Sequence, residues 1–280
     1  MERPLKYILA KHGLTLKKAF GQNFLTDETL LSEIVEKAGI TKDDTVVEIG
    51  CGAGALTEKL AKKAARVFGY EIDERLKPVL NETLADFDNV KIIFKDVLKE
   101  KIPDMEQAMG KPYKVVANLP YYITTPIVMN FLENARNMLS MTIMVQEEVA
   151  ARFSAVPSNK DYGAITVGIN LRGKAETVMK VPREKFTPAP SVDSAVVRID
   201  IEKDKFAGEN LKKVRDCVRV GFSGRRKTIV NNLMNGFNMQ RAVAEEVARL
   251  ADIPPLARAE NLSAEQFVSL SHAVEKVQKD

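Results

Sequence analysis

The sequence predicts an α/β protein with a doubly wound parallel sheet, followed by a small all-helical domain. From Thr45 onwards, short apolar runs typical of buried strands alternate with patterns of helical spacing. A glycine-rich turn follows the first apolar run, and acidic residues close the next two. After Asp204 the strand patterns stop, and amphipathic helical patterns continue to the end. We therefore expect a sheet domain over residues 1–204 and a helical domain over residues 205–280.

The elements can be placed in order along the chain. Apolar runs predict strands over residues 45–49, 66–70, 90–94, 113–117, 141–145, 165–171 and 195–201. Helical spacing predicts helices over residues 55–65, 76–87 and about 125–138, and one from a cap at Thr26 or Asp27 to Gly39. Strands that alternate with helices pair in parallel through right-handed crossovers. No helix signal separates the last two runs, so we expect both to join one edge of the sheet, antiparallel.

Composition excludes several classes of protein. The chain of 280 residues has 45% hydrophobic and 29% charged residues, as soluble globular proteins do. No apolar run approaches the ~20 residues that cross a bilayer, and the charged N-terminus lacks the apolar core of a secretory signal. Its two cysteines, Cys51 and Cys217, and two histidines, His12 and His272, form no disulfide framework and no metal motif. We therefore expect a cytoplasmic protein without a metal or a membrane partner.

Positive charge is concentrated in residues 1–25, a basic N-terminal arm, and in residues 205–241 of the helical domain. A solvated surface and a phosphate-binding surface are both consistent with such clusters. In the helical domain we favour a phosphate-binding face, on which Arg215 and Arg219 lie one turn apart. Contacts of this kind give affinity without reading a base sequence. The candidate contacts are Lys17, Lys18, Arg225, Arg226 and Lys227.

The glycine-rich turn predicts a nucleoside-type cofactor. Gly50, Gly52 and Ala55 fit the pattern G-x-G-x-x-A, in which glycines let the backbone approach a ligand at the start of a helix. Glu71 closes the next strand about 20 residues further on, where a carboxylate accepts from ribose hydroxyls. This conjunction favours a cofactor site over a purely structural turn.

Three acidic residues distinguish between possible cofactors. Glu48 directly precedes the turn, Glu71 closes the second strand, and Asp96 follows the third. A carboxylate at Glu48 would repel a pyrophosphate but suits the cationic amine of an amino-acid moiety. Asp96 can accept from an adenine amine. Each acid alone could be a solvated strand end or a helix cap, but together they favour S-adenosyl-L-methionine over a nicotinamide dinucleotide.

A stiff turn follows the fourth strand. Pro120 fixes its own φ and holds Leu119 extended, so the side-chain oxygen of Asn118 and the carbonyl of Leu119 can be aimed at one point. With the ring of Tyr121, two acceptors suit a planar base that carries an exocyclic amine. An ordinary strand-to-helix turn is the alternative on these residues alone. Phe186 could supply a second ring, although its spacing by itself favours core packing.

These motifs together resemble the class I S-adenosylmethionine-dependent methyltransferases that act on adenine amines. The residues that carry the resemblance are 48–54, 71–73, Asp96 and 118–121. Three further segments, 21–25, 186–197 and 222–233, resemble the ribosomal RNA adenine N6-dimethyltransferase family, and within it the bacterial small-subunit branch whose loss gives kasugamycin resistance. The resemblance covers nearly the whole chain. It departs from the family at Cys51, where bacterial relatives often have proline, and we expect a plain spacer there.

The resemblance implies a cofactor-binding set. Gly50 would approach the methionine part of the cofactor, Glu71 its ribose and Asp96 its adenine, and Leu25 would close over it with Asn23 from the N-terminal arm. The implied set is Asn23, Leu25, Gly50, Gly52, Glu71, Asp96 and Asn118.

The resemblance also implies a base-binding set. Asn118 and the Leu119 carbonyl would accept from the target amine, and Tyr121 and Phe186 would sandwich the flipped base. The implied set is Asn118, Leu119, Pro120, Tyr121 and Phe186.

The resemblance implies a substrate as well. It would be two adjacent adenosines near the 3′ end of small-subunit ribosomal RNA within a pre-30S particle, each dimethylated at N6. Two alternatives stay open: a large-subunit RNA methyltransferase of the resistance type, and an assembly factor whose binding role outweighs catalysis. The extended C-terminal helical segment favours the small-subunit type, and the complete cofactor set favours catalysis.

Overall fold

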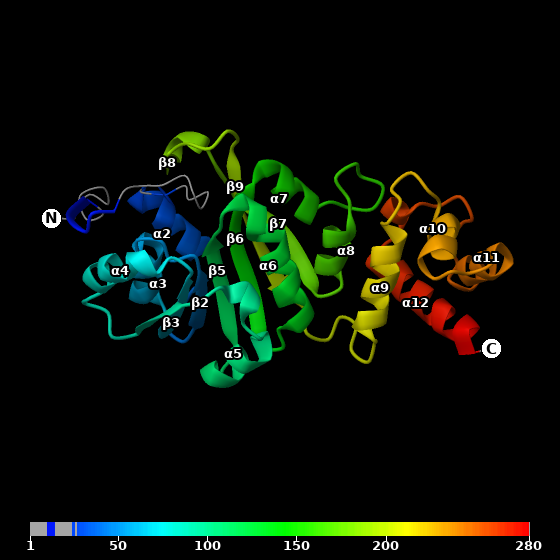
Figure 1. Cartoon of the computed structure of the whole chain (residues 1–280), viewed down its shortest axis with the longest axis horizontal. Coiled ribbons are helices and arrows are strands. Elements are labelled where there is room, and N and C mark those ends of the chain that lie inside the picture. The colour runs from blue at the N-terminus through cyan, green and yellow to red at the C-terminus, as the bar shows by residue number, and fades with distance from the viewer. Residues whose placement is uncertain (1–9, 15–23, 26, 280) are drawn as a thin grey trace. The chain divides into compact units, whose positions relative to one another are not determined.

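The computed structural model describes residues 10–14, 24, 25 and 27–279 (Figure 1). The chain divides into two compact units, Met1–Ala150 with Glu176–Ile201, and Ala151–Ala175 with Glu202–Asp280. The later boundary lies close to the expected one at residue 204. Residues 151–175, which we expected in the sheet domain, group with the second unit.

A seven-stranded sheet forms the centre of the first unit, and its strand order is β4-β3-β2-β5-β6-β9-β7. Neighbours from β4 to β6 pair in parallel, and β9 pairs antiparallel with β6. The strands are β2 (Thr45–Ile49), β3 (Arg66–Glu71), β4 (Val90–Phe94), β5 (Tyr113–Asn118), β6 (Met138–Gln146), β7 (Gly173–Val181) and β9 (Ser194–Ile201). The chain winds outwards from β2 to β4 and then returns to place β5 beside β2. This reversal creates a crevice at the carboxyl ends of β2 and β5, where doubly wound sheets bind ligands.

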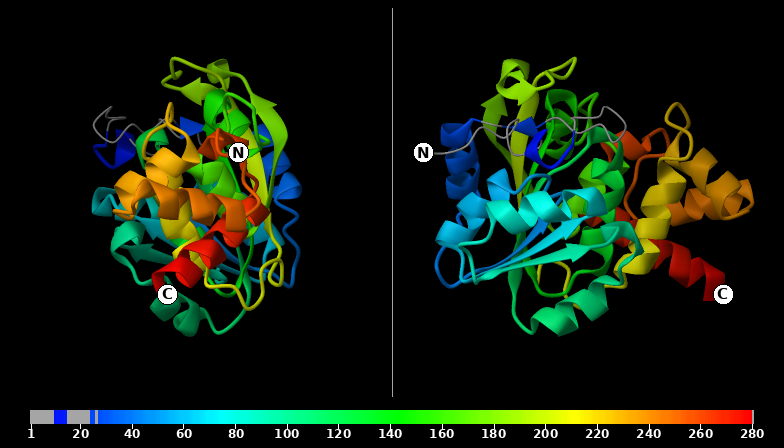
Figure 2. Two further views of the ribbon diagram at one scale, coloured as in Figure 1. Left: turned by 90° about the vertical axis from the view of Figure 1, so that its right-hand side faces the viewer. Right: turned by 60° about the vertical axis from the view of Figure 1, so that its left-hand side comes forward.

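Helices cover both faces of the sheet (Figures 1 and 2). Buried side chains of α2 and α3, such as Ile34 and Leu60, pack on Val46, Val116 and Met144 of one face. The opposite face carries α6, whose buried side chains contact β6, and α5 packs against α6. The helices of this unit are α2 (Glu28–Lys37), α3 (Ala55–Lys63), α4 (Lys77–Thr83), α5 (Ile102–Met109) and α6 (Tyr121–Asn134). After β6, α7 (Glu147–Phe153) crosses the boundary between the two units.

The second unit is helical and has its own apolar core. Phe267 and Leu270 of α12 pack with Leu233 of α10, and the rings of Phe222 and Phe267 stack with centroids 6.0 Å apart. Its helices are α8 (Ala164–Asn170), α9 (Leu211–Gly221), α10 (Ile229–Gly236), α11 (Arg241–Leu250) and α12 (Ala264–Lys279). The predicted fold class, a doubly wound sheet followed by helices, is confirmed.

Two predicted elements were wrong. Residues 165–171 form most of α8 rather than a strand, and the edge strand is the following β7. Five successive residues from Ile165 to Ile169 are buried, so the run has no polar face whose period could separate helix from strand. The helix expected at 125–138 begins at Tyr121 and ends at Asn134. Pro126 therefore lies inside the helix, where it leaves one carbonyl without its usual donor.

The sheet has no room for a side chain at Gly69 on β3. A Cβ there would lie 2.4 Å from Cys51 Sγ and 2.7 Å from Ile92 Cδ1. Because overpacking a tight core costs about 1–3 kcal/mol, we expect Gly69→Ala to lower the free energy of unfolding by that amount in chemical denaturation. Gly163→Ala is the control, since a Cβ at Gly163 meets nothing within 4 Å. Equal stability of the two variants would contradict the packing argument.

Candidate active site

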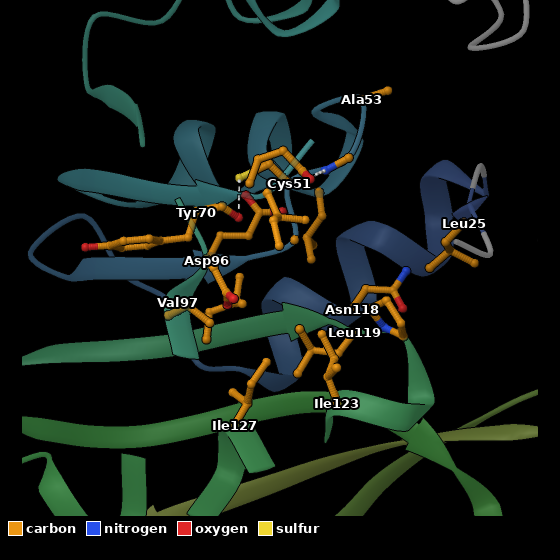
Figure 3. A pocket seen from close by; sticks show the side chains of 18 of the residues that line it. Leu25, Cys51, Ala53, Tyr70, Asp96, Val97, Asn118, Leu119, Ile123 and Ile127 are labelled. Carbon is orange, nitrogen blue, oxygen red and sulfur yellow. Dashed lines mark hydrogen bonds between the residues drawn. The ribbon is translucent and has the colours of Figure 1, made fainter. Parts of the chain in front are cut away.

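A cavity of about 350 Å³ opens at the carboxyl ends of β2, β3, β4 and β5 (Figure 3). It brings together residues that are far apart in the sequence, because the ends of parallel strands meet at one edge of a sheet. The predicted site residues that line it are Leu25, Gly50, Gly52, Glu71, Asp96, Asn118, Leu119, Pro120, Tyr121 and Phe186. Asn23, Lys17 and Lys18 lie outside the described residues, and the loop with Arg225, Arg226 and Lys227 belongs to the second unit.

The glycine turn joins β2 to α3 with left-handed backbone at Gly50, Gly52 and Gly54, where φ is 79°, 55° and 91°. Residues with a Cβ rarely adopt these angles, so the turn depends on glycine. Gly54 is the N-cap of α3, which directs the positive end of that helix towards the cavity.

Glu71 ties the end of β3 to the glycine turn. Its Oε2 accepts from the Gly52 amide at 2.8 Å, and its Oε1 accepts from the Asp73 amide at 2.9 Å. Burial raises the pKa of this carboxyl, and the two amides oppose that rise. Each carboxylate oxygen has a second lone pair, so the group can hold the turn and still accept from a ribose hydroxyl.

Asp96 caps the short helical turn Val97–Lys99 after β4, and its Oδ1 accepts from the Leu98 amide at 3.0 Å. Sequence reasoning missed the apolar residues beside it. Ile72, which is 58% exposed, lines the cavity together with Val97 and Leu98. The available signal was the position of Ile72, an apolar residue directly after the strand-end Glu71. These side chains offer apolar surface to a flat ring, while Asp96 offers an acceptor at its edge.

Glu48 is the most deeply buried carboxyl group in the site. It is 1% exposed and lines the cavity, and neither of its carboxylate oxygens has a hydrogen-bond partner among the described residues. Burial is the largest cause that raises its pKa, and nearby Glu71 also raises it; Thr57 and Cys51 lower it, and the resulting pKa is about 8. An unpaired buried acid of this kind is compensated when a cation binds beside it. The carboxyl groups of the site therefore suit a ligand with an amine and do not suit a pyrophosphate.

The hydrogen-bond acceptors and the aromatic ring of the turn after β5 line the same cavity. Asn118 is the last residue of β5, Pro120 is the N-cap of α6, and Tyr121 is the first residue of that helix. Among the described residues the Asn118 side-chain amide has no hydrogen-bond partner, which leaves it available to a ligand. The Tyr121 Oη lies 2.8 Å from Ser194 Oγ, and burial raises the pKa of the phenol. Ser194 is a further residue that sequence reasoning missed.

Phe186 belongs to both the core and the cavity wall. It is 4% exposed and lies in β8 (Phe186–Thr187), which pairs antiparallel with β1 (Phe24–Leu25), so that Phe186 faces Leu25 in the register. The core packing that its spacing favoured is therefore observed, and one part of the residue still lines the cavity.

Metal sites and membrane-spanning helices can be recognised from the arrangement of residues in a folded chain. Within residues 10–14, 24, 25 and 27–279, no group of three or more His, Cys, Asp or Glu residues is arranged to hold a metal ion. Within the same ranges, no helix has the length and apolarity that a membrane span requires.

The charge of Glu48 predicts a pH-dependent stability. The unfolded carboxyl titrates near 4.5 and the folded one near 8. Between these values the folded chain keeps a proton that the unfolded chain has released, so stability falls as pH rises. Glu48→Gln removes this dependence, and its melting temperature should exceed that of the wild type at pH 8 and match it near pH 4.

The control for this measurement is Glu36→Gln, which removes an exposed carboxylate from α2. Its melting temperature should follow the wild type at every pH. A Glu48→Gln variant with a constant offset from the wild type between pH 4 and pH 8 would contradict the buried-charge argument.

Comparisons with known proteins agree with this geometry. The family model described as ribosomal RNA adenine dimethylase matches residues 13–276. The Bacillus pumilus protein named ribosomal RNA small subunit methyltransferase A is 45% identical to this chain, and the match covers 97% of this chain and 95% of that protein. The Enterococcus faecalis protein of the same name is 44% identical, and the match covers 97% of this chain and 94% of that protein. A dimethyladenosine transferase from Plasmodium falciparum superposes with a TM-score of 0.76 at 25% identity, over 91% of this chain and 98% of that one. The 23S rRNA methyltransferase ErmE superposes with a TM-score of 0.68 at 30% identity, over 90% and 100%. The chain belongs to the ribosomal RNA adenine dimethylase family.

Proposed function

We propose that this protein dimethylates the N6 amines of two adjacent adenosines near the 3′ end of small-subunit ribosomal RNA. It would act in the cytoplasm on a pre-30S particle, as part of small-subunit biogenesis. One observation carries the proposal: the Asn118 turn shares a single cavity with the buried, unpaired Glu48. An acceptor for a neutral amine thus lies in the same space as a buried carboxyl group whose charged form a cationic ligand would favour. The names of the relatives supply the small-subunit substrate.

S-adenosyl-L-methionine is the methyl donor of this family, and the residues of the cavity fit it. Glu48 would face its amine, Glu71 its ribose and Asp96 its adenine amine, with Ile72 against the purine and Leu25 on the side of the N-terminal arm. When bound, the cofactor supplies an electrophilic methyl group.

The chain's own residues would activate the adenine by holding it. The lone pair of an exocyclic adenine amine is delocalised into the ring, so the amine is a weak nucleophile. If Asn118 Oδ1 and the Leu119 carbonyl accept its two hydrogens, the lone pair is directed away from the ring plane. The reaction is then governed by positioning. No strong general base is required before transfer, because the amine becomes acidic as it is alkylated.

The same groups would serve the second methylation. A monomethylated amine keeps one hydrogen, which Asn118 can still accept. Stacking on Tyr121 and Phe186 stabilises an extruded base by roughly 1–3 kcal/mol per ring. Pro120 keeps the turn stiff while the base re-enters.

RNA binding by the second unit is supported by its basic loop. Arg225, Arg226 and Lys227 line a shallow hollow before α10, are exposed, and have no ion pair among the described residues. The buried Asn232 holds this loop by donating to the carbonyls of Gly221 at 2.6 Å and Gly224 at 3.2 Å. Three unpaired cations on a fixed loop suit a phosphate backbone.

One residue of the expected phosphate-binding face is engaged elsewhere. Arg219 pairs with Asp216 on the same helix, 2.9 Å away. The support for phosphate binding therefore rests on the basic loop before α10 more than on α9.

A second candidate function is methylation of large-subunit RNA, which the likeness to ErmE favours. Purified small and large subunits incubated separately with labelled cofactor distinguish the two, and mapping of the methylated adenosines tests the site. Label confined to two adjacent adenosines near the 3′ end of small-subunit RNA supports the proposal, and label in large-subunit RNA overturns it. A role dominated by assembly predicts that a catalytically dead variant still supports subunit maturation.

Asn118→Ala should keep cofactor binding, through the other six residues of the implied cofactor-binding set, and lose methylation. A misplaced reacting group costs roughly 100-fold in rate, so we expect a loss of at least that size in single-turnover assays. Calorimetry with S-adenosyl-L-methionine checks the binding. Asn134→Ala, which removes an exposed amide from the end of α6, is the control and should methylate normally. Full activity of Asn118→Ala would refute its role.

Replacing Arg225, Arg226 and Lys227 by glutamine should weaken binding to small-subunit RNA uniformly across sequences. The slope of log affinity against log salt should fall by about one for each phosphate that the loop no longer neutralises. The matched control is Arg241→Gln, an exposed arginine of the same unit that already pairs with Glu245. Unchanged affinity and slope in the triple variant would remove the loop from the interface.

A further inference from the structure

The phenol of Tyr121 is held by a hydroxyl from a different part of the chain. Tyr121 begins α6 and Ser194 begins β9, and their oxygens lie 2.8 Å apart. Ser194 is 1% exposed, so its hydroxyl is shielded from water. Either hydroxyl can donate, and the pair satisfies two polar groups that would otherwise be costly to bury.

The backbone around Ser194 is anchored on both sides. In the antiparallel ladder Ser194 faces Gln146 of β6. The preceding residue, Asp193, accepts from the Glu147 amide through its carbonyl at 3.1 Å, and from the Arg183 amide through its side chain at 3.0 Å. The Ser194 hydroxyl is therefore a fixed point, and Tyr121, which is only half-buried, is the group that it restrains.

The segment that ends at Ser194 also carries the second ring of the cavity. Residues 182–193 connect β7 to β9 and contain Phe186. Phe186 is held by pairing with Leu25, and the neighbouring Lys185 pairs with Asp27 at 2.6 Å. One loop thus supports Phe186 directly and Tyr121 through the Ser194 hydroxyl.

We infer that Ser194 is a positioning residue for methyl transfer, whose hydroxyl fixes the ring plane of Tyr121 relative to Phe186 so that the base is presented to Asn118. The inference rests on the proposed function of the cavity. Without the bond, the phenol loses the hydrogen bond that ties it to β9, and the ring can turn more freely about its side-chain bonds. Ser194 need not touch the base, because it acts through Tyr121.

The test is a double-mutant cycle on the intact protein with purified small subunits as substrate. Ser194→Ala and Tyr121→Phe each remove one hydroxyl of the hydrogen bond. If the bond positions the ring for methyl transfer, its loss should slow the reaction about tenfold. We expect each single variant to lower kcat about tenfold and to keep KM for the subunit within about twofold of the wild-type value. The double variant should be no slower than either single variant, because both substitutions remove the same bond. Ser194→Thr keeps the hydroxyl and should retain most of the rate. Wild-type rates in Ser194→Ala, or additive losses in the double variant, would overturn the inference.

A second measurement reports on the ring without any activity. 3-Fluorotyrosine at position 121 gives a 19F resonance in the ligand-free protein, and Ser194→Ala should move it towards the shift of an exposed tyrosine and narrow it. Ser271→Ala removes another buried hydroxyl, bonded to the Val268 carbonyl at 2.8 Å, and should change neither the resonance nor the rate. An unmoved resonance in Ser194→Ala refutes the restraint.

The two measurements separate this inference from the proposed function. If the wild type methylates no small-subunit RNA, the proposed substrate is wrong, and the resonance still decides whether Ser194 restrains the ring. If the wild type methylates and Ser194→Ala equals it in rate and resonance, the inference alone fails.

Discussion

The close approach of two parallel strands is the constraint on which the rest of the site depends. Ile49 of β2 faces Ala117 of β5 in the register, so the glycine turn and the Asn118 turn leave the sheet side by side. A Cβ at Gly50 would lie 3.5 Å from the Asn118 carbonyl oxygen, and φ at Gly50 is 79°. Group transfer requires reacting atoms about 3–3.5 Å apart. Because adjacent strands lie about 4.8 Å apart, ligands bound at the glycine turn and at the Asn118 turn can approach each other that closely. The topology thus performs most of the positioning before any side chain contributes.

Electrostatics then determines which ligand fits the first of these sites. Glu48 and Glu71 lie on neighbouring strands, both nearly fully buried, and Glu71 raises the cost of charging Glu48. Cys51 lies between them, and burial together with both acids raises the pKa of its thiol well above the usual value. The thiol therefore stays protonated and neutral in the free protein. Charging Glu48 is costly in the free protein, so its carboxyl keeps a proton up to about pH 8, and a cationic amine bound beside it would favour the charged form.

Sequence reasoning was reliable where one local pattern sufficed. The glycines at 50, 52 and 54, the strand before them and the acids that close β3 and follow β4 are local features, and the parallel topology then brings them together. It was wrong for residues 165–171, because a helix buried on all sides has no periodic signature. It could not assign a role to Ser194, although segment 186–197 contains this residue, because its partner Tyr121 is 73 residues away in the sequence. Side-chain pairs of that kind follow from the assembled topology.

The ribbon formed by β1 and β8 connects the two halves of the site. Leu25 lies in the N-terminal segment expected to close over the cofactor, and its register partner Phe186 lies in the loop expected to hold the base. The Lys185–Asp27 pair fixes the same loop to the cap of α2. Movement of the ribbon would therefore displace the walls on both sides of the cavity. A surface ion pair contributes little to stability by itself, about 0–1 kcal/mol. Its structural consequence here is that it holds two distant segments of the chain together, one expected to face the methyl donor and the other its acceptor.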